Sequence, residues 1–148
     1  AHIAHDCKVG NNCVFANNAT LAGHVEVGDW AILGGLAAVH QWSRIGCHSF
    51  IGGLAAVTRD LLPFGMAVGN RANLEGINLV GMRRRNFSKS EIDEVKKVYS
   101  ILFNANDLEF KNKINKLKKE KFSSDPAKII TDFVNVETNR AYVSPTEI

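Results

Sequence analysis

VGDWAILGGLAAVHQWSRI, residues 27–45, carries a large apolar residue at every sixth position. The same period runs through ten positions of the first 60 residues: Ile3, Val9, Phe15, Leu21, Val27, Leu33, Val39, Ile45, Ile51 and Val57. A period of six fits neither an amphipathic helix, which repeats about every 3.6 residues, nor a long strand, which repeats every two. It is typical of a solenoid in which each side of a coil is one hexad long.

The other hexad positions predict a narrow, filled interior. The residue four positions after each apolar one is small or compact: Cys7, Cys13, Ala19, Val25, Ala31, Ala37, Ser43, Ser49 and Ala55. The residue directly after it is Ala or Gly, except at His40 and Thr58. Alternating large and small inward residues reach the density of a protein core. Three hexads, 18 residues, would close one triangular coil, so that residues 18 apart stack about 5 Å apart, as neighbouring strands do.

The composition changes along the chain and predicts three parts. Residues 1–64 form the solenoid, residues 65–87 an irregular connector after Pro63 breaks the repeat, and residues 88–148 a small helical domain. A capping box, Ser88 to Glu91, starts a helix over about 88–104. A second helix is predicted near 107–121, and Asp125-Pro126 starts a third. No capping element precedes the first repeat, so we expect the chain to be the C-terminal part of a longer protein.

Charge follows the same division. Residues 83–121 hold 12 basic and 6 acidic residues, within a chain whose net charge is +3. This stretch is either a set of solvated helix faces or a docking surface for an acidic partner. A nucleic-acid role is disfavoured, because few aromatic residues are interleaved with the basic ones. No apolar run approaches the 18 residues of a membrane span. Zinc at Cys47-His48 is also disfavoured, because no second pair of ligands follows at suitable spacing.

An 18-residue coil brings histidines together at one edge. His5, Gly23 and Gln41 would lie above one another, and Asp6, His24 and Trp42 would form the adjoining column. An imidazole can remove a proton from a hydroxyl near neutral pH, and an accessible Gly N–H can stabilise the oxyanion that develops. The two columns therefore predict a site suited to acyl transfer. His40, at a position otherwise held by small residues, is expected to turn outward or to distort the corner.

Several segments together resemble the UDP-N-acetylglucosamine O-acyltransferase family, which begins lipid A synthesis. They are His2-Ile-Ala-His5-Asp-Cys, Ala16-Asn-Asn-Ala-Thr-Leu-Ala-Gly-His24-Val, Val39-His-Gln41 and Gly81-Met-Arg-Arg-Arg-Asn-Phe-Ser88. The resemblance implies a mainly β fold with some α, in which a left-handed parallel β-helix of hexapeptide repeats precedes a small C-terminal helical domain. It also implies a cytoplasmic homotrimer with no metal or organic cofactor. The reaction would move a 3-hydroxyacyl group from acyl carrier protein to the 3-hydroxyl of UDP-N-acetylglucosamine.

The resemblance also assigns roles to single residues. His5 matches the general base, Asp6 its orienting partner, and the Gly23 N–H the oxyanion donor. The sugar, diphosphate and nucleotide contacts would come from His2, His24, His40, Gln41, Asn78 and Arg84. Gly53 matches the floor of the acyl groove, where a residue without a side chain leaves room for a long chain. The sequence departs from the family at Val80, usually Glu, at Arg71, often His, and at Trp42, commonly Phe.

The residues alone leave three other functions open. The sister N-acyltransferase of the same pathway acylates an amine instead of a hydroxyl. A trimeric hexapeptide-repeat carbonic anhydrase would hold zinc through histidines between subunits. A scaffold without enzymatic activity would need none of the histidines. Product analysis, metal analysis and replacement of His5 separate these alternatives.

Overall fold

The computed structural model describes residues 1–104 and 108–146. The chain forms two compact units. The first, the β unit, contains Ala1–Asn78 together with the C-terminal residues from Asn139 onward. The second, the helical unit, spans Leu79–Thr138. The predicted helical domain therefore ends too late, because the last residues of the chain return to the β unit.

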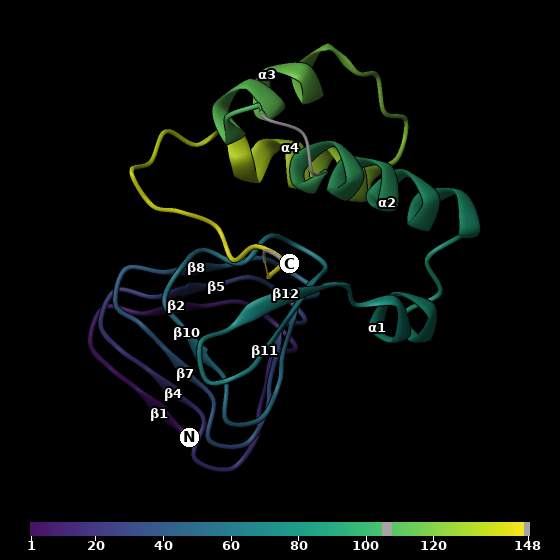
Figure 1. Cartoon of the computed structure of the whole chain (residues 1–148). Helices are drawn as coiled ribbons and strands as arrows, with labels where there is room; N and C mark the ends of the chain where they lie inside the picture. The colour runs from purple at the N-terminus through teal and green to yellow at the C-terminus, as the bar shows by residue number, and fades with distance from the viewer. Residues whose placement is uncertain (105–107, 147–148) are drawn as a thin grey trace. The chain divides into compact units, whose positions relative to one another are not determined.

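Ten two-residue strands build the regular part of the β unit. They are β1 (His2–Ile3), β2 (Lys8–Val9), β3 (Val14–Phe15), β4 (Thr20–Leu21), β5 (Glu26–Val27), β6 (Ile32–Leu33), β7 (Ala38–Val39), β8 (Arg44–Ile45), β9 (Phe50–Ile51) and β10 (Ala56–Val57). They form three parallel sheets in the orders β1-β4-β7-β10, β2-β5-β8 and β3-β6-β9, the last extended by two further strands (Figure 1). β1 to β7 each pair with the strand 18 positions later, as in His2 with Thr20 and Val14 with Ile32. The predicted coil of three hexads is therefore confirmed.

The inward positions of the hexads form the core of this unit. Large Leu21 and Leu33 and small Ala19 and Ala31 are all fully buried. In the first coil the equivalent large residue Ile3 keeps 50% of its surface exposed, because a coil covers it on one side only. Burial of these side chains is the main favourable contribution to folding here, at about 25 cal/mol per Å² of apolar surface.

Every corner of the coil contains a residue in the left-handed region. These residues are Asp6, Asn12, Asn18, His24, Trp30, Leu36, Trp42, His48 and Leu54, with φ between 56° and 65°. Such a conformation costs about 1 kcal/mol or more for residues other than Gly, Asn and Asp. From the second coil onward a backbone hydrogen bond between coils offsets part of that cost, since His24 N–H donates to His5 O and Trp42 N–H to Gly23 O. The repeated turn makes the corner residues stack in three columns.

The solenoid continues beyond its predicted end at residue 64. Leu61 bridges to Ile45, and β11 (Gly65–Val68) pairs in parallel with β9. β12 (Asn73–Ile77) then folds back antiparallel on β11. The predicted irregular connector over 65–87 is therefore wrong for these strands. The reason is that the last coil pairs at a spacing of 16 residues, as in Phe50 with Met66, so the hexad period no longer reveals it.

The C-terminal segment covers part of the last coil. Asp60 N–H donates to Ala141 O, Val143 N–H donates to Asp60 O, and Leu74 N–H donates to Ser144 O. An unpaired strand edge offers free N–H and C=O groups to other chains. Residues 141–144 satisfy some of these groups within the same chain, so they function as a cover for the edge.

The described residues of the helical unit form four helices. They are α1 (Leu79–Arg84), α2 (Lys89–Phe103), α3 (Phe110–Lys119) and α4 (Asp125–Asn135). The predicted capping box is confirmed, because Ser88 Oγ accepts from Glu91 N–H and the Glu91 carboxylate accepts from Ser88 N–H. α3 is shorter than the predicted 107–121, and residue 107 lies outside the described residues. α4 begins after Ser124, so Pro126 is its second residue, and α1 was not predicted.

Polar contacts as well as apolar burial hold the helices together. Val98, Leu102, Leu117 and Ile130 are buried between α2, α3 and α4. The Glu94 carboxylate accepts hydrogen bonds from Ser123 N–H and Oγ and from Ser124 N–H. The side chain of Ser124, followed by the backbone N–H groups of Ser123 and Ser124, lowers the pKa of Glu94 to about 2. Among the helices that the structure describes, none is long and apolar enough to cross a membrane.

Candidate active site

The first predicted column is present at the corner that follows β1, β4 and β7. His5 and Gly23 are connected through the bond from His24 N–H to His5 O, and Gly23 and Gln41 through the bond from Trp42 N–H to Gly23 O. The His5 imidazole lies over Gly23: a Cβ on Gly23 would be 2.6 Å from His5 Cε1 and 2.7 Å from Nε2. Position 23 therefore leaves no room for a side chain. Gly23 is buried under the ring, whereas the sequence predicted an accessible glycine.

Asp6 is the partner of the His5 ring. His5 Nδ1 lies 2.9 Å from Asp6 Oδ2, and both side chains are exposed. The hydrogen bond with His5, followed by the charge of His24, lowers the pKa of Asp6 below its ordinary value. An ionised carboxylate can only accept, so it requires a proton on Nδ1 and leaves Nε2 of a neutral ring as an acceptor. This is the tautomer that a general base needs.

His24 joins this pair from the second coil. Its Nε2 is 3.8 Å from Asp6 Oδ2, and its ring meets that of His5 edge-on at 5.0 Å between centroids. On its other side Trp42 stacks on it at 3.9 Å with an interplanar angle of 2°. The predicted column of Asp6, His24 and Trp42 is therefore a continuous stack that fixes the His24 ring.

The same corner could hold a metal ion. One ligand atom each from His5, Asp6 and His24 lies within 4.8 Å of the other two. Two imidazoles and a carboxylate suit zinc or a related divalent transition metal. Cys47 does not belong to this group, and burial raises the pKa of its thiol to about 11, which keeps it protonated.

The third coil contributes His40 and Gln41, and both residues are exposed. An outward position was predicted for His40. His40 N–H donates to Val57 O, which fixes its backbone. The ring Nδ1 of His40 lies 3.1 Å from Gln41 O. His2 is exposed on β1, where it pairs with Thr20. These residues share one sheet and the turn that follows it.

The remaining predicted contacts fall elsewhere. Asn78 is buried; its Nδ2 donates to His48 O at 3.0 Å, so this donor is used within the fold. Arg84 is exposed at the end of α1 in the helical unit. Gly53 is exposed at a different corner of the coil, next to Leu54, which keeps 69% of its surface exposed. The structure therefore brings together His5, Asp6, Gly23, His24 and Gln41, whereas Asn78 and Gly53 lie elsewhere in the β unit and Arg84 belongs to the helical unit.

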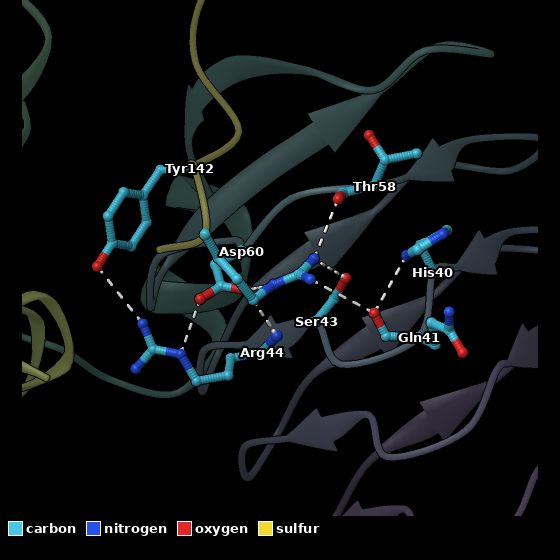
Figure 2. A network of polar contacts seen from close by, with 8 residues as sticks. His40, Gln41, Ser43, Arg44, Thr58, Asp60 and Tyr142 are labelled. Carbon is cyan, nitrogen blue, oxygen red and sulfur yellow. Dashed lines mark hydrogen bonds and ion pairs between the residues drawn. The ribbon is translucent and has the colours of Figure 1, made fainter. Parts of the chain in front are cut away.

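Sequence reasoning missed a charged cluster beside the third coil, drawn in Figure 2. Asp60 is fully buried between two arginines: Arg44 Nε donates to its Oδ2 at 2.8 Å and Arg140 Nε to its Oδ1 at 2.9 Å. Tyr142 Oη lies 3.4 Å from Arg44 Nη2, and burial raises the pKa of Tyr142. One signal was available in the sequence, an Asp directly before the apolar run from Leu61 to Phe64. Nothing in the sequence showed that Arg140 would be its partner.

The fold indicates the class of protein, and comparison with known proteins indicates the family. Parallel coils of hexads with a histidine–carboxylate corner define the class of hexapeptide-repeat β-helix proteins. The family model described as "Udp N-acetylglucosamine O-acyltransferase; Domain 2" matches residues 60–143. The chain belongs to the UDP-N-acetylglucosamine O-acyltransferase family.

Relatives and solved structures agree with this assignment. The chain is 44% identical over 145 residues to an acyl-[acyl-carrier-protein]–UDP-N-acetylglucosamine O-acyltransferase of Sinorhizobium fredii, a match that covers 98% of this chain and 53% of the relative. A Burkholderia thailandensis relative of the same name is 47% identical over 136 residues, covering 90% of this chain and 52% of the relative. The chain thus spans about half the length of the curated relatives it matches.

Two solved structures show the likeness in three dimensions. The Arabidopsis UDP-N-acetylglucosamine acyltransferase superposes with a TM-score of 0.86 at 34% identity, covering 95% of this chain and 51% of that one. The Campylobacter jejuni enzyme superposes with a TM-score of 0.84 at 38% identity, covering 98% and 55%. The fold is accordingly the left-handed parallel β-helix predicted from the sequence.

Proposed function

We propose that this chain carries catalytic residues of an O-acyltransferase that moves a 3-hydroxyacyl group from acyl carrier protein to the 3-hydroxyl of UDP-N-acetylglucosamine. The main support for this proposal is the position of the His5 imidazole, which lies over Gly23 and is hydrogen-bonded through Nδ1 to Asp6. The family and the names of the relatives support the choice of donor and acceptor.

The chemistry follows from the two nitrogens of His5. Nε2 takes the proton of the sugar hydroxyl as its oxygen attacks the thioester carbonyl of the donor. The negative charge that forms on the carbonyl oxygen is stabilised by the Gly23 N–H. Collapse of this intermediate breaks the carbon–sulfur bond, and the leaving thiolate takes the proton from the His5 imidazolium. Asp6 stabilises that imidazolium and holds the ring in its orientation.

Binding of the sugar nucleotide is assigned to residues around this corner. His2, His24, His40 and Gln41 line the sugar and diphosphate pocket in this proposal, and Trp42 supports the His24 ring. Arg84 stays a predicted nucleotide contact. Asn78 is a weaker candidate, because its side-chain donor is bonded to His48 O.

The acyl chain and its carrier are assigned to other surfaces. Gly53 forms the floor of the acyl groove, and its exposed neighbour Leu54 provides apolar surface for a long chain. The basic residues of the helical unit, which include Lys116, Lys118 and Lys119 at the end of α3, suit the acidic surface of acyl carrier protein. The active form is proposed to be a homotrimer with a site between each pair of subunits.

Product analysis tests this function. The protein is incubated with UDP-N-acetylglucosamine and 3-hydroxyacyl carrier proteins of short and long chain, and the product is identified by mass spectrometry and by its ester linkage. We expect an ester at the 3-hydroxyl, formed faster from the long donor. No transfer to UDP-N-acetylglucosamine would contradict the proposal. Amide formation on an acceptor with a free amine would then favour the sister N-acyltransferase, and no transfer to either acceptor would favour a scaffold.

A second function has one observation in its favour, the convergence of His5, Asp6 and His24. If these residues held zinc, its bound water would ionise near neutral pH and the site could hydrate carbon dioxide. Metal analysis of the purified protein separates the two functions. Acyltransferase activity without bound metal supports the first proposal, and stoichiometric zinc with carbon dioxide hydration supports the second.

A further inference from the structure

The C-terminal segment returns to the part of the coil where the hexad rule fails. His40 and Thr58 are the two residues that replace Ala or Gly directly after the apolar position. They are 18 residues apart and lie on successive coils, because Ala38 pairs with Ala56 and Val39 with Val57. After Thr58 the spacing shortens to 16 residues. The regular stacking of this corner therefore ends at the third coil.

Arg140 bonds to both irregular turns at once. Its Nη2 donates to Thr58 O at 3.1 Å and to Ser43 Oγ at 2.7 Å, while its Nη1 lies 3.5 Å from Gln41 O. Its Nε is occupied by the buried carboxylate of Asp60. Figure 2 labels Asp60, Ser43, Gln41 and Thr58, and its dashed lines mark these contacts. The planar fork of arginine makes these contacts simultaneously, which a lysine could not do.

The Gln41 carbonyl links Arg140 to the His40 ring. A carbonyl oxygen only accepts, so the contact with His40 Nδ1 at 3.1 Å requires the proton on Nδ1. Nε2 of a neutral His40 then stays an acceptor for a ligand hydroxyl or amide. Arg140 holds the carbonyl that selects this tautomer. We propose that Arg140 is a positioning residue for the sugar-nucleotide pocket, because it fixes the Gln41 carbonyl and with it the orientation of His40.

This inference rests on the proposed function for the identity of the ligand, but its structural part can be tested alone. Arg44 offers a matched control. Both arginine side chains donate to Asp60, so R140A and R44A each leave the buried carboxylate with one remaining guanidinium, besides the bond from the backbone N–H of residue 44. Arg140 also contacts Gln41 and Thr58, and R44A leaves the arginine that makes these contacts in place. Any effect common to both variants comes from Asp60, and any effect confined to R140A comes from the turns.

The first measurement is the ring-nitrogen NMR spectrum of His40 in the full protein, with R44A, R140A and R140K compared. We expect the Nδ1–H tautomer to dominate in the unmodified protein and in R44A, and to lose population in R140A. R140K keeps a positive charge beside Asp60 and so protects the fold if R140A unfolds, yet it should still change the His40 signals. Unchanged His40 signals in both Arg140 variants would overturn the proposal.

The second measurement is the kinetics of acyl transfer. R140A is expected to raise the KM for UDP-N-acetylglucosamine about tenfold, with kcat and the KM for the acyl donor within about twofold. If R44A and R140A raise the KM for UDP-N-acetylglucosamine equally, the positioning role is overturned. The increase would then come from the loss of a partner of Asp60. If the unmodified protein does not bind UDP-N-acetylglucosamine at all, the proposed function and the substrate assignment fail together. In that case the NMR result still decides whether Arg140 orients His40.

Discussion

Two corners of the same coil share a backbone and differ in chemistry. At the corner after β4 and β7, His24 and Trp42 adopt φ near 60° and stack on one another. At the corner after β6 and β9, Leu36 and Leu54 adopt the same conformation and form the same backbone bond, such as Leu54 N–H to Gly35 O. Leu36 and Leu54 keep 56% and 69% of their surfaces exposed. The repeat therefore provides equivalent positions, and the side chains decide that one corner is polar and reactive and the other apolar.

Glycine substitution gives the largest expected contrast between these corners. Gly23 and Gly35 occupy the same hexad position, but a Cβ on Gly35 would meet only Asn17 O at 3.5 Å, an ordinary contact. G23A should push the His5 ring away and lower kcat/KM about 100-fold, because a displacement of about 1 Å in a catalytic group has that effect. G35A should stay close to the unmodified rate.

Circular dichroism provides the control for that comparison. The His5 side chain is exposed and can move without disturbing the core, so both variants should keep native spectra and melting temperatures. Equal activity of G23A and G35A would mean that the ring over Gly23 has no catalytic importance.

Removing the corner side chains gives a smaller contrast. W42A takes away the ring that stacks on His24, and a stacked aromatic pair contributes about 0.5–1.5 kcal/mol. We therefore expect the KM for UDP-N-acetylglucosamine to rise about threefold to tenfold in W42A. W42F should fall between W42A and the unmodified protein. L54A, the matched change at the apolar corner, should leave this KM unchanged; an equal rise would show that the stack has no particular role.

Backbone strain at the corners predicts a stability difference. Leu54 has φ of 62°, which Asn tolerates better than Leu, and its exposed side chain loses little burial when replaced. L54N should raise the free energy of unfolding by about 0.5–1 kcal/mol in a denaturant titration. N18L, the reverse change in the same column, should lower it. Destabilisation by L54N would indicate that another surface covers Leu54 in solution.

The helical unit supplies a polar contact that is structural, in contrast to the reactive corner. The folded-state pKa of Glu94 is lowered to about 2, below the value of about 4.5 expected unfolded. Its contribution to stability is therefore present above pH 4.5 and is lost as the pH falls toward 2. E94Q should weaken this acid dependence of α2–α4 unfolding, followed by helical circular dichroism between pH 6 and 2, without changing the rate of acyl transfer. An unchanged acid profile would contradict this assignment.

The regular parts of the molecule could be predicted from the sequence because equivalent positions of a repeat have the same surroundings and therefore carry the same type of residue. Hexads led to the 18-residue coil and to the contact of His5 with Gly23, and the Ser88 capping box located α2 within a residue. β11 was missed because a 16-residue coil has no repeat to reveal it. Arg140 was missed because its partner Asp60 is 80 residues away and no period relates them.

The most direct test of the central claim is the rate of acyl transfer in H5A compared with N17A. Both residues occupy the same hexad position in the first coil, and both carbonyls accept a backbone bond that alanine retains, from His24 N–H and from Leu36 N–H. We expect H5A to lose about 10²-fold to 10⁴-fold in kcat, with native secondary structure, and N17A to be unaffected. An H5A variant that transfers the acyl group at the unmodified rate would contradict the central claim.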